Sequence, residues 1–286
     1  MDYKTCWELQ QGLFDALVAR KAACKGATKQ VAAPLAANAG TAEASKASAR
    51  EPAQRSAEAM PSKAGTQSGK GLESPTGSVS AAEGVEPSGA TGEGSASAGT
   101  ILLVEHPPVY TLGKSGHAEN LLIGREALEA MGSRFFHIDR GGYITFHGPG
   151  QLVCNPILDL ERIGIGLREY IEALEEAVIR TVAEYGIAAG RIAGASGAWI
   201  DPGKARPRKI CAIGVRSSRY VTMHGFALNV TTDLEWFSRI NPCGFTDRGV
   251  TSIAAETGSQ PSMQEVKQLV IRELATALQC EITSGS

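Results

Sequence analysis

Residues 25–99 limit what this chain can fold into more than any other stretch. They are mainly Ala, Ser, Gly, Pro, Glu and Lys, and they contain no aromatic residue. Large apolar side chains are too sparse there to offset the entropy that ordering would cost. We therefore predict a disordered insertion over 25–99, with transient helical propensity in its alanine-rich part. Because the cost of closing a loop grows slowly with its length, the residues on either side can belong to one domain.

The flanking sequence has the hydrophobic patterns of an ordered domain. Residues 6–24 have apolar side chains at helical spacing, and the run 101–104 is typical of a strand buried on both faces. The remaining expected elements are extended segments at 109–113, 135–138, 143–146, 152–158 and 220–230, a hairpin of 197–200 with 209–216, and helices at 125–131, 167–185 and 262–278. This order predicts an α+β fold, a mixed or antiparallel sheet with packed helices. It divides the chain into a first helix (1–24), the insertion (25–99) and the rest of one domain (100–282).

Composition excludes several classes of function. The net charge of −2 does not favour binding to nucleic acid or to an anionic membrane. No apolar run approaches the roughly 20 residues that span a bilayer, and the first residues lack the pattern of a signal peptide. The six cysteines form no CxxC pair, which favours a reducing compartment over a disulfide framework or zinc site. We expect a cytoplasmic protein without a metal or a nucleotide phosphate loop.

The stretch 140–151 reads RGGYITFHGPGQ and is the densest glycine cluster outside the insertion. Residues 143–146 have strand propensity, and glycines on both sides allow backbone conformations that other residues resist. Arg140 and His147 bracket the strand with a permanent cation and a titratable ring. The stretch predicts one wall of a ligand site, although an ordinary hairpin with turn glycines has the same pattern.

Two residues stand out as candidates for chemistry. Cys243 lies between a proline and a glycine in an expected turn, where a thiol near a cation is more readily ionised. Lys209 opens an apolar strand, where it is either a solvated strand end or an inward-facing base. Cys154 and Cys211 lie inside apolar strands and are expected to be small core residues. His147 and His224 are each either a base or a satisfied structural histidine.

Five blocks together resemble one enzyme family. LVEHPPVYTLGKSG, RGGYITFHGPGQ, RKICAIGVRSS, VTMHGFALNV and INPCGFTDRGVTSI resemble the octanoyltransferases of lipoic acid biosynthesis, in the family's order and over nearly everything except 25–99. The resemblance implies the fold of the lipoate–protein and biotin–protein ligases. It also implies an acyltransferase that moves an octanoyl group from acyl carrier protein to a lysine of lipoyl domains, in 2-oxoacid dehydrogenases and the glycine cleavage H protein. No ATP, metal or other cofactor is implied, and we expect a monomer.

The resemblance also implies roles for particular residues. Cys243 would form an acyl-thioester intermediate, with Lys209 as its partner and as the base. The acyl-binding residues would be Arg140, Gly141, Gly142, Tyr143, Ile144, Thr145, Phe146, His147, Ala212, Ile213, Gly214, Gly225, Phe226 and Ala227. The chain departs from the family at Asn155, where a tyrosine is usual, and in its long insertion.

Two other functions are compatible with the same blocks. The first is an ATP-dependent lipoate–protein ligase, which would need adenylate-binding features and would not need Cys243. The second is a non-catalytic acyl-binding or scaffold protein, with 25–99 as its interaction region. A thioester is already an activated acyl donor, so an octanoyltransferase needs no ATP. This reading therefore explains why the sequence has no nucleotide phosphate loop.

Overall fold

The computed structural model describes residues 1–30, 78–82, 97–241 and 248–284. The chain divides into two units, Met1–Ala22 with Ser74–Ser286 and Ala23–Glu73. Of the second unit only 23–30 are described; they form the end of α1 (Tyr3–Gln30). The sheets, the cores and the candidate site described below belong to the first unit.

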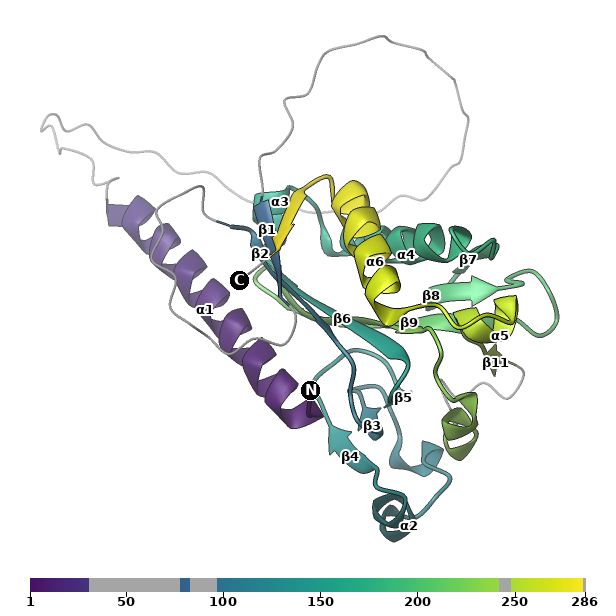
Figure 1. Cartoon of the computed structure of the whole chain (residues 1–286). Helices are drawn as coiled ribbons and strands as arrows, with labels where there is room; N and C mark the ends of the chain where they lie inside the picture. The colour runs from purple at the N-terminus through teal and green to yellow at the C-terminus, as the bar shows by residue number, and fades with distance from the viewer. Residues whose placement is uncertain (31–77, 83–96, 242–247, 285–286) are drawn as a thin grey trace, which may run out of the picture. The chain divides into compact units, whose positions relative to one another are not determined.

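The largest element of the first unit is a sheet of nine strands, counted over the described residues (Figure 1). Its order is β12–β1–β2–β6–β10–β9–β8–β7, and β11 pairs with the first two residues of β9, Arg208 and Lys209. The strands are β1 (Ser78–Ala82), β2 (Gly99–Val104), β6 (Gln151–Leu158), β7 (Ala189–Ile192), β8 (Ala195–Ile200), β9 (Arg208–Ser218), β10 (Val221–Asn229), β11 (Gly249–Val250) and β12 (Glu281–Ser284). Pairing is antiparallel from β2 to β7 and parallel at β1 and β11. The predicted α+β fold with a mixed sheet is confirmed.

Two amphipathic helices, α4 (Leu167–Ala183) and α6 (Met263–Leu278), cover one face of this sheet (Figure 1). Their apolar residues recur every three or four positions, so one stripe of each helix is buried. Leu174 and Leu274 are completely buried there. They join Cys154 and Cys211 of the sheet in the largest hydrophobic core. Both helices and the core role of these two cysteines follow the prediction.

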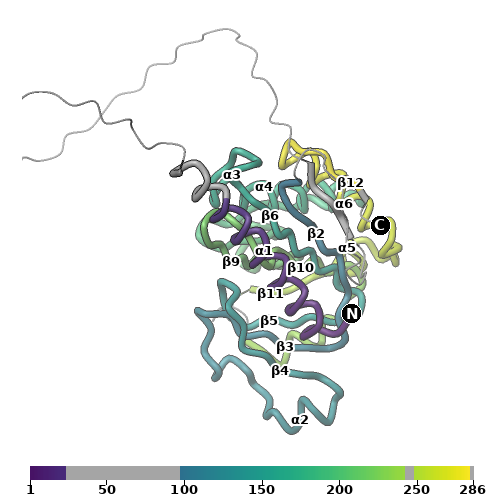
Figure 2. The backbone as a smooth tube through the Cα atoms, turned by 90° about the vertical axis from the view of Figure 1, so that its left-hand side faces the viewer, coloured from purple at the N-terminus to yellow at the C-terminus, as the bar shows by residue number. Residues whose placement is uncertain are grey.

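The other face is covered by α1, which lies in front of β2, β6 and β10 in Figure 2. Asp2 caps its start, because Asp2 Oδ1 accepts from the backbone N–H of Lys4 at 3.0 Å. Further along, Phe14 packs with Leu102 and Met223 in a second core. The first turns of α1 therefore lie against the centre of the sheet.

A smaller sheet and its own core lie beside the main sheet. Its strand order is β4–β3–β5, with β4 (Arg134–His137), β3 (Val109–Leu112) and β5 (Ile144–His147). Phe146 is the centre of its core and stacks on Trp236 at 5.1 Å between ring centroids. The short elements around the two sheets are η1 (Ala118–Asn120), α2 (Arg125–Ala130), α3 (Leu160–Ile163), η2 (Leu234–Arg239) and α5 (Ile253–Thr257).

Pro156 lies in the middle of the main sheet, whereas a proline favours a sheet edge or a bulge. β6 pairs with β2 on one side and with β10 on the other. The pairing with β10 ends at Cys154, so the missing N–H of Pro156 faces a place where the ladder has already stopped. The Thr222 hydroxyl donates to the Pro156 carbonyl at 2.9 Å and replaces part of that ladder.

The predicted boundaries of the insertion remain a prediction. α1 continues past residue 24 to Gln30, and β1 occupies residues 78–82 within the range 25–99. β1 pairs with both β2 and β12, so this part of the range belongs to the main sheet. Residues 31–77 and 83–96 lie outside the described residues. No helix in the described part of the chain is both long and apolar enough to cross a membrane.

Candidate functional site

A cavity of about 390 Å³ lies along β9, between the main sheet and the loop that precedes β5. Its volume is within the range of small-molecule sites, about 300–1,000 Å³. The predicted acyl-binding residues that line it are Arg140, Gly141, Gly142, Tyr143, Ile144, Thr145, Ala212, Ile213, Gly214 and Ala227. Small and apolar residues of β9 and β10 form its floor, because Ala212 pairs directly with Ala227. Segments predicted from separate sequence blocks thus meet at one cavity.

Lys209 lines the same cavity at the start of β9. Its Nζ donates to the Ser196 carbonyl oxygen at 3.3 Å and lies 4.6 Å from the centroid of the Trp199 ring. Arg248 approaches the same ring, with its Cζ at 5.3 Å. Two cations at an aromatic face give this end of the cavity a positive character. Trp199 and Arg248 were not predicted as site residues. The predicted hairpin could have indicated Trp199, because Trp199 lies opposite Lys209 in the strand pair.

Arg140 stabilises the conformation of the loop between β4 and β5 by bonding to two of its carbonyl groups. Its Nη1 donates to the Gly141 carbonyl at 2.7 Å, and its Nη2 donates to the Tyr143 carbonyl at 2.9 Å. The loop lies directly on β9, since a Cβ at Gly214 would come within 2.7 Å of the Gly141 carbonyl oxygen. Glycine at 214 therefore allows the loop and the strand to approach closely.

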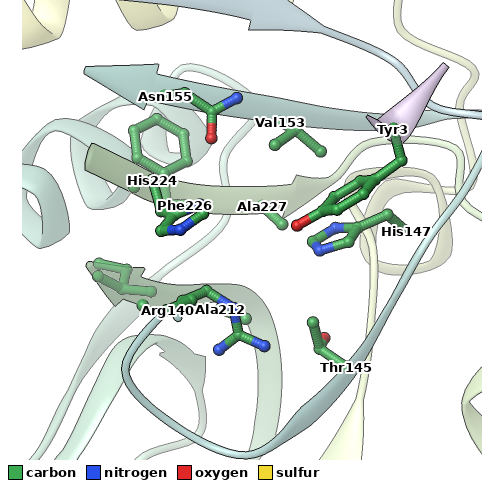
Figure 3. A pocket seen from close by; sticks show the side chains of 13 residues that line it. Tyr3, Arg140, Thr145, His147, Val153, Asn155, Ala212, His224, Phe226 and Ala227 are labelled. Carbon is green, nitrogen blue, oxygen red and sulfur yellow. The ribbon is translucent and has the colours of Figure 1, made fainter. Parts of the chain in front are cut away.

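A second, smaller cavity of about 40 Å³ adjoins these residues (Figure 3). Six predicted residues line both cavities: Arg140, Thr145, Ala212, Ile213, Gly214 and Ala227. The predicted residues His147, Gly225 and Phe226 line only the smaller one. Its volume is enough for water but not for an acyl chain. The predicted acyl-binding residues therefore line two neighbouring cavities that share part of their walls.

Four lining residues of the smaller cavity were not predicted to bind the acyl group: Tyr3, Val153, Asn155 and His224. Tyr3 of α1 directs its hydroxyl between His147 and Ala227, and Asn155 of β6 lies on the opposite wall (Figure 3). Burial raises the pKa of the Tyr3 hydroxyl well above its ordinary value, so Tyr3 is neutral. The link between residue 3 and the site depends on tertiary packing of α1. No local sequence signal indicates it.

Both candidate histidines are buried, and the structure favours their structural role. His147 donates from Nδ1 to the Gln151 side-chain oxygen at 2.8 Å, in the tautomer that this contact requires. Burial lowers the pKa of His147 to about 3. A ring that stays neutral and is held by a fixed partner is a poor general base near neutral pH.

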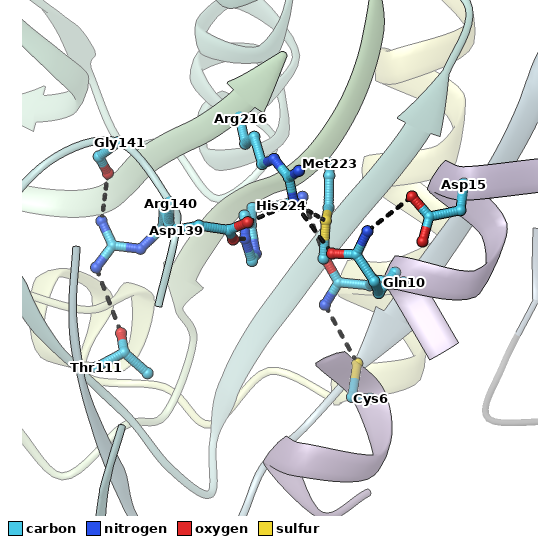
Figure 4. A network of polar contacts seen from close by, with 11 residues as sticks. Cys6, Gln10, Asp15, Thr111, Asp139, Arg140, Gly141, Arg216, Met223 and His224 are labelled. Atoms are coloured by element: carbon cyan, nitrogen blue, oxygen red, sulfur yellow. Dashed lines mark hydrogen bonds and ion pairs between the residues drawn. The ribbon is translucent and has the colours of Figure 1, made fainter. Parts of the chain in front are cut away.

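His224 belongs to a polar network that joins the Arg140 loop to α1 (Figure 4). Its Nε2 lies 3.0 Å from Asp139 Oδ1, and Arg216 pairs with the other carboxylate oxygen of Asp139. Arg216 also donates to the Gln11 side chain of α1 at 3.0 Å. The hydrogen bond with His224 and the charge of Arg216 lower the pKa of Asp139, and they outweigh burial, which raises it. Burial also lowers the pKa of His224. His224 has a φ of 60°, a left-handed conformation that is rare inside a strand.

Phe146 lies apart from the other predicted acyl-binding residues. Side chains alternate along β5, and Thr145 faces the cavities. Phe146 therefore faces the opposite way, into the core of the small sheet, where only 1% of it is exposed. It lines neither of the two cavities, and its predicted role in acyl binding stays a prediction.

The predicted nucleophile, Cys243, lies outside the described residues. The described cysteines do not compete for its role. Cys154 and Cys211 are completely buried, and burial raises the pKa of both thiols far above the ordinary value. Burial also raises the pKa of Cys6 and Cys280 to about 11. A thiol that stays protonated is a weak nucleophile.

The cavity walls and fold define a small-molecule site on an α+β domain, and comparison with known proteins gives its family. Residues 91–275 match the lipoyl protein ligase A/B catalytic domain. The octanoyltransferase of Bacteroides fragilis is 60% identical over 178 residues, which cover 62% of this chain and 80% of the relative. That of Bacteroides thetaiotaomicron is 57% identical over 189 residues, covering 66% and 83%.

The solved structures agree on the fold. A bipartite lipoate protein ligase from Thermoplasma acidophilum superposes with a TM-score of 0.53 at 18% identity, over 65% of this chain and 73% of that one. At this identity the likeness concerns the fold alone. The chain belongs to the lipoyl protein ligase A/B catalytic domain family.

Proposed function

We propose that this protein is an octanoyltransferase that moves an octanoyl group from octanoyl-acyl carrier protein to a lysine of lipoyl domains. The observation that carries the proposal is the cavity of about 390 Å³, which joins a lysine to a floor of small residues. The identity of 57–60% to octanoyltransferases supports the same reaction. The acceptors would be the lipoyl domains of 2-oxoacid dehydrogenases and the glycine cleavage H protein.

In the first half of the reaction, the Cys243 thiolate attacks the thioester carbonyl of the donor. The new C–S bond forms, the old one breaks, the carrier protein's thiolate leaves and takes a proton from the Lys209 ammonium, and Cys243 holds the octanoyl group. A cation such as Lys209 favours the thiolate before this step. Each methylene of the chain that the cavity removes from water contributes about 0.8 kcal/mol to binding.

In the second half, the incoming lysine attacks the thioester carbonyl as its neutral amine, and Lys209 in its neutral form removes one proton from the attacking nitrogen. The amide bond forms, the C–S bond breaks, and the Cys243 thiolate leaves beside the protonated Lys209. Backbone N–H groups near the thioester would stabilise the oxyanion, a contribution of about 3 kcal/mol per donor in other enzymes. The thioester supplies the free energy, so the reaction needs no ATP or metal.

A transfer assay without ATP tests this proposal. The enzyme is incubated with octanoyl-acyl carrier protein and a lipoyl domain, and the mass of the domain is followed. We expect the domain to gain one octanoyl group in the absence of ATP. Modification that requires ATP and free octanoate or lipoate, and that survives Cys243→Ala, would instead identify a ligase.

A further inference from the structure

The peptide unit between Ser196 and Gly197 connects Lys209 to a carboxylate of α4. On one side, Lys209 Nζ donates to the Ser196 carbonyl oxygen at 3.3 Å. On the other, the Gly197 N–H donates to Glu175 Oε1 at 3.0 Å. In a trans peptide the carbonyl and the following N–H point in opposite directions. The negative end of this dipole therefore faces Lys209, and its positive end faces the carboxylate.

Glu175 is buried on α4, where Arg191 is its ion-pair partner among the residues that the structure describes. It is 7% exposed, and Arg191 Nε lies 3.0 Å from its Oε2. A buried carboxylate is unfavourable unless it is paired and hydrogen-bonded. Arg191 occupies one oxygen and the Gly197 N–H the other, so the carboxylate has partners on both oxygens. Hydrogen bonds in such a chain polarise one another.

Gly197 fixes the plane of this peptide unit. Its φ is +127°, and a Cβ there would lie 2.4 Å from the Cys211 carbonyl oxygen. The register between β8 and β9 also shifts between Ala198 and Trp199. The backbone at this position therefore accommodates only glycine, and the Ser196 carbonyl is held toward Lys209.

We propose that Glu175 is a positioning residue for Lys209, acting through the Ser196–Gly197 peptide. The carboxylate fixes the carbonyl that accepts from the amine and adds negative potential at the ammonium. This inference rests on the catalytic role of Lys209 in the proposed function. It adds a second layer to the site, on a helix that carries none of the predicted site residues.

Other charges also face Lys209 and set the background for this effect. Arg140 and Arg248 line the same cavity, and Arg208 precedes Lys209 in β9. Arg208 is paired with Asp201 and Glu256. The Cys211 thiol stays neutral because burial raises its pKa. Among the described residues, Glu175 is the carboxylate joined to Lys209 through one peptide unit.

The charge state of Lys209 can be read without any activity assay. The folded enzyme is treated with trace acetic anhydride over a pH series, and Lys209 acetylation is measured by peptide mass spectrometry. Lys4, whose side chain is 65% exposed, serves as the internal reference. We expect Glu175→Gln to lower the midpoint of Lys209 acetylation by about 1 pH unit, because a nearby negative charge is lost. Arg191→Gln should raise that midpoint, since it leaves the carboxylate uncompensated.

Glu176→Gln is the matched control. Glu176 is adjacent on α4 and also bonds Arg191, at 2.8 Å, but Gly197 bonds Glu175 instead. This variant should leave the midpoint unchanged. Equal midpoints in wild type, Glu175→Gln and Arg191→Gln would overturn the inference, even if melting temperatures fall. The proposed function fails separately, if the wild-type enzyme transfers no octanoyl group from octanoyl-acyl carrier protein to a lipoyl domain.

Discussion

Among single residues, Lys209 is the proposed base of the reaction. Its amine has a carbonyl acceptor and the Trp199 ring beside it. We expect Lys209→Ala to lower the transfer rate by about 10²- to 10⁴-fold, the usual contribution of a positioned base. The melting temperature should change little, since the side chain lines a cavity. Lys204→Ala is the control: its side chain is 74% exposed in a turn. Near-normal turnover of Lys209→Ala would remove this lysine from the mechanism.

His147 gives a second prediction at the residue scale, concerning stability and pH. Burial lowers its pKa from 6.5 to about 3. Between these values the unfolded chain binds a proton that the folded chain excludes, so stability falls as pH falls from about 6.5. The slope should approach about 1.4 kcal/mol per pH unit for this histidine. Urea unfolding at pH 4.5, 5.5, 6.5 and 7.5 measures it, and His147→Gln should flatten the profile. A flat wild-type profile would contradict the burial argument.

At the scale of elements, β5 separates the site from a core. Thr145 lies on the cavity side and Phe146 on the core side, stacked on Trp236. Phe146→Ala should therefore lower the free energy of unfolding by about 3–5 kcal/mol. Phe146→Leu, which retains most of the volume, should cost less and leave the KM for the octanoyl donor unchanged. An increase in KM with little loss of stability would return Phe146 to the acyl site.

Patterns within single elements were predictable, and contacts between elements were not. The helical stripes of α4 and α6 and the apolar run of β2 follow from local spacing. The contribution of Tyr3 to the smaller cavity depends on how α1 packs across the sheet. Pro156 would locally indicate a strand at the edge of a sheet. It lies instead in a central strand, at a place where the hydrogen-bond ladder with β10 has stopped. Local propensity contains neither kind of information.

At the scale of the whole molecule, the sequence blocks predict which residues meet at the site. Lys209, Arg140 and Ala227 come from separate blocks and line one cavity. The blocks do not predict that His147, Gly225 and Phe226 line only a second cavity. That division follows from the register of the strands and from the loop lying on Gly214.

The long insertion also gives a prediction at this scale. The first unit combines Met1–Ala22 with Ser74–Ser286, and β1 within it bridges β2 and β12. We expect that replacing residues 31–73 with a Gly/Ser linker of about 20 residues leaves kcat/KM within about twofold, since loop closure depends weakly on length. Removing β1 as well should lower stability. A large loss of transfer activity on replacing 31–73 alone would assign this segment a role in the reaction.

The proposed reaction depends on a covalent octanoyl intermediate at Cys243. The most direct measurement is the intact mass of the enzyme after exposure to octanoyl-acyl carrier protein without an acceptor. We predict one added octanoyl group on wild type, mapped to Cys243 by peptide mass spectrometry, none on Cys243→Ala, and loss of the group when a lipoyl domain is added. An unmodified wild-type enzyme that still transfers octanoate, or an adduct at another residue, would contradict the account.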